Sequence, residues 1–74
     1  MRLMVTANAE SPYTLMIEPW GMTYELTGTG QMFVDMEVPM GDQPELVAWP
    51  GGFSIFACGR AATRDAGGRV LHEF

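Results

Sequence analysis

Short apolar segments separated by Gly and Pro fill the 74-residue chain, and no helical pattern interrupts them. The clearest of them is Met22–Thr27, in which Met22, Tyr24 and Leu26 alternate with polar residues. A period of two is typical of a strand with one buried face, whereas a helix needs a period of 3.6 over about 10 residues. The sequence therefore predicts an all-β protein with no helix longer than about two turns.

The expected strands are short, and turn residues separate them. They are Arg2–Ala7, Tyr13–Glu18, Met22–Thr27, Gln31–Val38, Glu45–Trp49, Phe53–Cys58 and Arg69–Phe74. Gly28–Gly30 is expected to join two of them as an antiparallel hairpin, and Gly59–Gly68 to be a loop with at most one helical turn. We expect a single domain over residues 1–74, an antiparallel β-sandwich or small barrel of six or seven strands.

The small size of the chain limits how it can be stabilised. Cys58 is the only cysteine, so no disulfide can form within one chain. One His and one Cys do not make a structural zinc site, and we expect neither a metal nor a cofactor. Since a domain of this size often needs an additional source of stability, self-association is the simplest remaining one.

The charge of the chain bears on its partners and its location. The formal net charge is −5, from nine acidic residues and four arginines. An acidic surface repels nucleic-acid phosphates and anionic lipids, so neither nucleic acid nor a membrane is an expected partner. The apolar run Leu3–Val5 is too short for a signal peptide or a membrane span, and a cytoplasmic location is expected.

One motif resembles a known group of proteins. Glu18–Gly21 (E-P-W-G) precedes Tyr24–Leu26 (Y-E-L), and this arrangement is similar to that of small uncharacterised bacterial all-β proteins, loosely cupin-like, over about Leu3–Phe33. The resemblance implies a β fold and carries no assigned activity. The usual metal-binding set of cupins, which combines several His with a Glu, is absent from this chain.

The same motif suggests a possible ligand pocket. Trp20 would be an aromatic platform and Glu18 a polar contact, with Tyr13 and Tyr24 completing the lining. The alternative is a purely structural corner, in which Gly21 adopts a backbone conformation that other residues resist. A cupin-like small-molecule binder is therefore the second functional hypothesis.

Other polar residues favour structural roles over catalysis. Cys58 and His72 lack any local pattern of a nucleophile and its base, and the Gly28–Gly30 run lacks the helix and Lys of a phosphate loop. The candidate carboxylate and anion-binding residues fall on solvent-facing strand positions or in one loop: Glu18, Glu25, Asp35, Glu37, Arg60, Arg64 and Asp65. We expect no catalytic residues and no enzyme activity.

Large apolar residues on the outward side of the strands are the strongest functional signal. With Leu26, Val34, Leu46 and Ile55 directed inward, alternation directs four others outward: Phe33, Val47, Trp49 and Phe56. A second β-layer, another copy of the chain, or a different partner or ligand could cover them. The first functional hypothesis is a non-enzymatic binding or assembly module that forms a homo-oligomer, with a dimer favoured.

Overall fold

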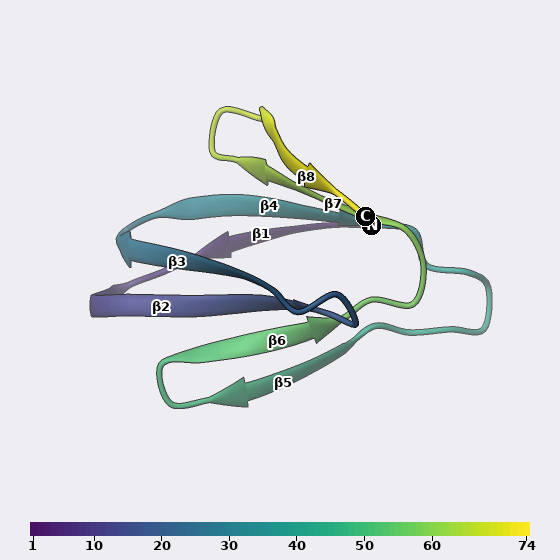
Figure 1. The fold of residues 1–74 in the computed structure, drawn as a ribbon, viewed down its shortest axis with the longest axis horizontal. Helices are drawn as coiled ribbons and strands as arrows, with labels where there is room; N and C mark the ends of the chain where they lie inside the picture. The colour runs from purple at the N-terminus through teal and green to yellow at the C-terminus, as the bar shows by residue number, and fades with distance from the viewer.

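Eight strands and no helix make up the computed structural model (Figure 1). It describes residues 1–8 and 11–74 in full, and residues 9 and 10 only by their place in a strand. The strands are β1 (Arg2–Thr6), β2 (Ala9–Glu18), β3 (Met22–Gly28), β4 (Gln31–Met36), β5 (Glu45–Trp49), β6 (Gly52–Phe56), β7 (Ala61–Asp65) and β8 (Val70–Glu73). The predicted all-β class is confirmed, with eight strands in place of six or seven.

The strands form two four-stranded sheets. The first has the order β1-β4-β7-β8 and the second the order β3-β2-β6-β5. Every pairing is antiparallel except that of β2 with β6, which is parallel. The expectation of a purely antiparallel arrangement is therefore wrong at this one pairing, which brings together segments far apart in the chain.

The predicted hairpin around Gly28–Gly30 is also wrong, because β3 and β4 belong to different sheets. β3 pairs with β2, whereas β4 pairs with β1 and β7. The buried side chains of Leu26 on β3 and Val34 on β4 both belong to the core, which the two sheets share. A three-residue connection with two glycines can form a hairpin within one sheet or carry the chain from one sheet to the other. The sequence of the connection does not distinguish these two arrangements.

The predicted loop Gly59–Gly68 contains strand β7. β7 lies between β4 and β8, and Ala61 and Thr63 are its buried residues. Small and polar side chains occupy these positions, so the segment lacks the alternation of large apolar residues that identifies a strand in a sequence. The buried hydroxyl of Thr63 shares a 2.6 Å hydrogen bond with the Tyr24 hydroxyl, and this bond links the two sheets.

One hydrophobic core joins the sheets. Its buried residues are Val5, Ala7, Leu15, Ile17, Leu26, Met32, Val34, Met36, Ile55 and Ala61. The predicted core positions Leu26, Val34 and Ile55 are confirmed, and Met22 and Tyr24 pack against the core while partly buried. The alternation on β3 and β4 was therefore interpreted correctly even though their pairing was not.

Strands β5 and β8 lie at the two opposite margins of the molecule (Figure 1). Every residue of both strands is exposed. Leu46 was expected to be inward, and its Cα partner in the sheet is the buried Ile55, yet Leu46 is 56% exposed. The side chain has the expected orientation, but β5 lies at the sheet margin, where little of the core covers it.

Candidate functional site: an apolar surface on β5 and β6

Three of the four predicted interface residues lie on one surface. Val47 is the Cα partner of Ser54, and Trp49 is the partner of Gly52. Gly52, Ser54 and Phe56 alternate along β6, so their side of the sheet is opposite to that of the core residue Ile55. We call the surface formed by Val47, Trp49 and Phe56 the outer β5–β6 face; these side chains are 44%, 37% and 40% exposed.

The outer face has a close contact at the turn between its strands. A Cβ atom at Gly52 would collide with the Thr14 carbonyl oxygen and would lie 2.9 Å from Cζ2 of Trp49. Trp49 therefore lies against the backbone of Gly52, while Gly51, at φ 89°, forms the turn. A second glycine directly after a turn is a sequence signal of such a close backbone approach.

The face continues onto β2 and is bordered by acidic residues. Ser54, only 6% exposed, lies between its Cα partners Val47 and Met16, so neighbouring apolar side chains cover it. Phe56 has Glu18 and Glu45 as Cα partners, one on each side. The result is an apolar surface with carboxylates along one end.

Phe33, the fourth predicted interface residue, lies on the other sheet. It is half-buried, its Cα partners are Met4 and Arg64, and the Arg2 guanidinium lies 5.0 Å from the centre of its ring. The structure therefore does not bring Phe33 together with Val47. The error follows from the wrong hairpin, which placed β4 beside the strands of the second sheet.

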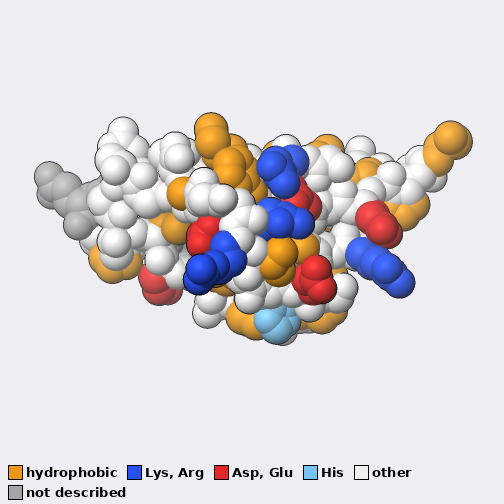
Figure 2. All heavy atoms as spheres, turned by 90° about the horizontal axis from the view of Figure 1, so that it is seen from above, with side chains coloured by type: hydrophobic (Ala, Val, Ile, Leu, Met, Phe, Trp, Pro, Cys, Tyr) orange, Lys and Arg blue, Asp and Glu red, His pale blue; other side chains and the backbone are white. Residues whose placement is uncertain are grey.

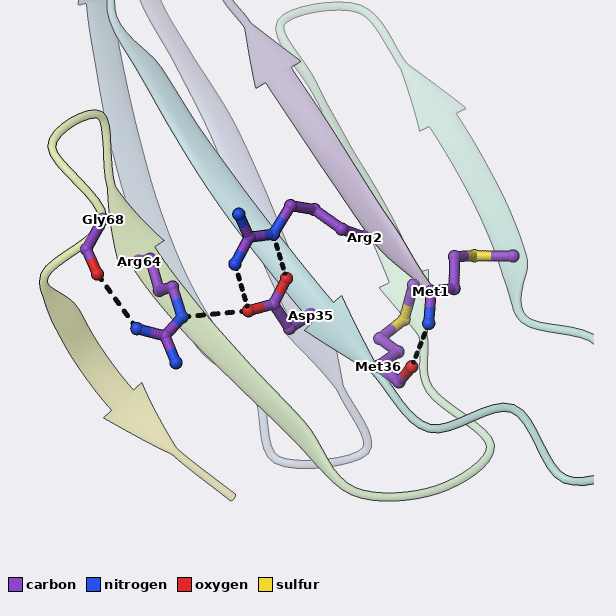
Figure 3. Close-up of polar contacts among 6 residues, drawn as sticks. All are labelled: Met1, Arg2, Asp35, Met36, Arg64 and Gly68. Carbon is purple, nitrogen blue, oxygen red and sulfur yellow. Dashed lines mark hydrogen bonds and ion pairs between the residues drawn. The ribbon is translucent and has the colours of Figure 1, made fainter.

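A network of charges ties three strands of the first sheet together (Figure 3). On Asp35, Oδ1 accepts a 2.6 Å hydrogen bond from Arg2 Nε, and Oδ2 accepts bonds from Arg2 Nη2 at 3.0 Å and from Arg64 Nε at 2.9 Å. Arg64 Nη1 donates to the Gly68 carbonyl oxygen at 2.9 Å. In the view from above, Figure 2 shows arginine side chains (blue) beside acidic ones (red) in the middle of the molecule.

The network determines the chemistry of Asp35. Hydrogen bonds from Arg2, and then from Arg64, lower the pKa of Asp35 to about 2 although partial burial opposes this. The carboxylate is therefore ionised at neutral pH, and both of its oxygens accept hydrogen bonds from the two arginines.

A shallow hollow of about 400 Å³ lies beside the network. Its charged side chains are Arg2 and Arg60 on the positive side and Asp35 and Glu37 on the negative side. The N-terminal ammonium group, at its edge, donates a 2.8 Å hydrogen bond to the Met36 carbonyl oxygen (Figure 3). The hollow thus has three positive groups and two carboxylates, and Arg2 is already bonded to Asp35, so a single positive charge in excess does not define an anion site.

The two tyrosines of the predicted pocket take part in internal contacts. The Tyr13 hydroxyl lies 3.4 Å from the Gly52 carbonyl oxygen, to which it donates. The Tyr24 hydroxyl is engaged with Thr63 between the sheets. Both side chains are partly buried and pack against the core, and neither lines the hollow described above.

Trp20 and Glu18 lie at the corner between β2 and β3. The Trp20 ring stacks on that of Phe74, with centroids 4.5 Å apart and an interplanar angle of 21°. The Glu18 carbonyl oxygen accepts the N–H of Ala57, and Gly21 has a φ of 70°, as expected for a tight corner. These contacts hold the E-P-W-G segment in a tight corner between the two strands.

The remaining chemical candidates do not form a reactive cluster. His72 is exposed on β8 and its ring lies 4.6 Å from that of Phe74, while Cys58 is half-buried after β6. Among residues 1–8 and 11–74, no three His, Cys, Asp or Glu side chains are placed to hold a metal ion. Within the described chain, no helix is long and apolar enough to cross a membrane.

Comparison with known proteins gave no match. The chain matches no protein-family model, and no curated protein or solved structure matches it at a significant level.

Proposed function

We propose that the chain is a non-enzymatic assembly module, a two-layered β-sandwich that associates with other copies of itself through the outer β5–β6 face. The observation that carries the proposal is the grouping of Val47, Trp49 and Phe56, each more than a third exposed, on one side of two adjacent strands. Trp and Phe are enriched at the centres of protein interfaces, where charged residues are depleted.

The energetics favour covering this face. Full burial of a large apolar side chain is worth about 1.5–3 kcal/mol, and a domain of this size has a net stability of only about 4–11 kcal/mol. Covering even part of three such side chains is therefore a large contribution for so small a protein. A second copy is the favoured occupant because a two-fold axis brings the same surface of both partners together.

Sedimentation velocity over a range of concentrations tests the proposal. The wild type should form a dimer or a larger homo-oligomer, and Val47→Glu and Trp49→Glu should be monomeric with an unchanged far-UV circular dichroism spectrum. The matched control is Met40→Glu, because Met40 is a fully exposed apolar residue in the β4–β5 loop. That variant adds the same charge away from the face and should associate like the wild type.

Two results would contradict the proposal. A wild type that remains monomeric at millimolar concentration would exclude self-association. An oligomer that is equally stable in all three variants would show that another surface holds it together.

A further inference from the structure

The open side of β5 offers backbone groups as well as apolar side chains. β5 is the margin strand of its sheet, pairs with β6 without a register shift, and is exposed along its whole length. β8, an edge strand of the other sheet, pairs with β7 with a register shift where Thr63 and Arg64 of β7 face His72 and Val70, an irregularity that disfavours pairing with another strand. The other two edge strands, β1 and β3, each contain a buried residue, so β5 is the regular edge strand that is exposed along its whole length.

The turn after β5 determines which backbone groups reach the open margin. Trp49 and Gly52 are Cα partners on either side of a two-residue turn, so they form the hydrogen-bonded pair that closes it. Bonded and non-bonded pairs alternate along an antiparallel ladder. The N–H and C=O groups of Leu46 and Ala48 therefore point away from β6, toward the open margin.

We propose that β5 pairs antiparallel with β5 of a second copy, about a two-fold axis at Val47. This register places Leu46 opposite Ala48 of the second copy, so the four outward N–H groups of the two strands all meet outward carbonyl groups. It also places Glu45 opposite Trp49 of the second copy. The inference rests on the proposed function, and it assigns to that function a strand, a register and a symmetry.

The prolines that flank β5 agree with this register. Pro44 immediately precedes the strand and Pro50 immediately follows it. With the axis at Val47, Pro44 of one copy lies opposite Pro50 of the other. Neither residue has an N–H to donate, so the ladder ends at the same point on both strands.

The charge on β5 also agrees with a two-fold axis at Val47. Glu45 is the only charged residue of β5. In this register the two Glu45 residues lie at opposite ends of the ladder, about 13 Å apart along the strands, which exceeds the ~8 Å Debye length at physiological salt. A two-fold axis at Glu45 would place the carboxylates directly opposite each other, an arrangement that is destabilising.

Such a dimer has a continuous sheet of eight strands. On its outer side, the two outer β5–β6 faces lie side by side as one surface that crosses the two-fold axis, with Val47 and Trp49 at the contact and Phe56 one strand farther from it. Val47 of each copy then contacts its counterpart, and each Trp49 lies beside Glu45 of the other copy. On the other side of the sheet, the exposed Leu46 lies opposite Ala48 of the second copy. The core of its own copy does not cover Leu46 at this position.

The first test is the pair Ala48→Pro and Ala48→Ser, examined by sedimentation velocity. Proline removes the outward N–H of residue 48 without removing a bond to β6, and serine keeps the N–H in a side chain of similar size. We expect Ala48→Pro to be a folded monomer and Ala48→Ser a dimer. A dimer that survives in Ala48→Pro overturns the edge pairing but leaves the proposed function intact. A monomeric wild type overturns both.

The second test does not depend on how Ala48→Pro folds. In a Cys58→Ser background, Val47→Cys places two thiols at the axis, where the Cα atoms of a non-bonded pair are about 4.5 Å apart. Leu46→Cys is the control, because its two Cα atoms would be on the order of 8 Å apart, too far for a disulfide. Under mild oxidation we expect a covalent dimer from Val47→Cys only.

Other outcomes of the thiol test identify other arrangements. Equal cross-linking of both variants, or cross-linking of Leu46→Cys alone, overturns the register. Species larger than a dimer in the wild type indicate pairing of β5 with β8 of another copy and overturn the two-fold model.

Discussion

At the scale of single residues, Asp35 couples stability to pH. Its side chain is 28% exposed, and its partners Arg2 and Arg64 are 54% and 32% exposed, so solvent screens much of the attraction. The pKa of Asp35 is lowered to about 2 in the folded chain. The unfolded chain therefore binds more protons between about pH 4 and pH 2, and stability declines as the pH falls through this range.

The variant Asp35→Asn should lose this dependence. We expect its free energy of unfolding to be about 1 kcal/mol lower at pH 7 and its stability to fall less steeply between about pH 4 and pH 2 than that of the wild type. Urea denaturation at a series of pH values measures both quantities. Asp42→Asn, in the exposed β4–β5 loop, is the control. Equal slopes for Asp35→Asn and the wild type would contradict the assignment.

Gly52 provides a second test at this scale. The variant Gly52→Ala should lose about 1–3 kcal/mol, because the new methyl group would overlap the Thr14 carbonyl oxygen and the Trp49 ring. Gly67→Ala is the matched control, since a Cβ there would meet only Asp65 Oδ1 at 3.5 Å, an ordinary contact. Chemical denaturation of the two variants compares them directly. A smaller loss for Gly52→Ala than for Gly67→Ala would show that Trp49 does not lie against this backbone.

At the scale of the elements, strands differ in how well their backbones are protected. β2 pairs on both sides and contributes the fully buried Leu15 and Ile17, whereas β5 pairs on one side and is exposed throughout. We expect β2 amides to exchange slowest and those of β5 and β8 fastest among the strands, measured by hydrogen exchange in dilute solution. Protection of β5 equal to that of β2 under these conditions would contradict this order.

Local patterns predicted most strands but not their partners. Alternation identified Met22–Thr27 because large apolar residues mark its buried side. β7 was missed because its buried residues, Ala61 and Thr63, are small or polar. The parallel pairing of β2 with β6 joins distant segments and leaves no mark in either of them.

For the candidate site, too, the sequence predicted which side chains point outward but not which strands are neighbours. Val47, Trp49 and Phe56 were assigned to the outward side by alternation alone, and their exposure agrees with it. Phe33 was grouped with them only through the wrong hairpin. The exposure of Leu46 depends on where β5 lies relative to the rest of the core, which is a property of the whole fold and not of the segment.

At the scale of the whole molecule, charge opposes association. Each copy carries a formal net charge of −5, so bringing two copies together is electrostatically unfavourable. We expect the dissociation constant of the oligomer to decrease as salt rises from 0.1 M to 1 M, because the Debye length shortens from about 10 Å to about 3 Å. Sedimentation equilibrium in the two buffers measures it. Weaker association at high salt would instead indicate an interface held by ion pairs.

The position of Trp49 against Gly52 has a practical consequence for all of these measurements. The chain has two tryptophans, and Trp20 lies at the other end of the second sheet, stacked on Phe74. In a Trp20→Phe background, the remaining indole belongs to the outer β5–β6 face, and it is partly in contact with water. Its fluorescence would report contact between copies directly, in solution and without an added dye.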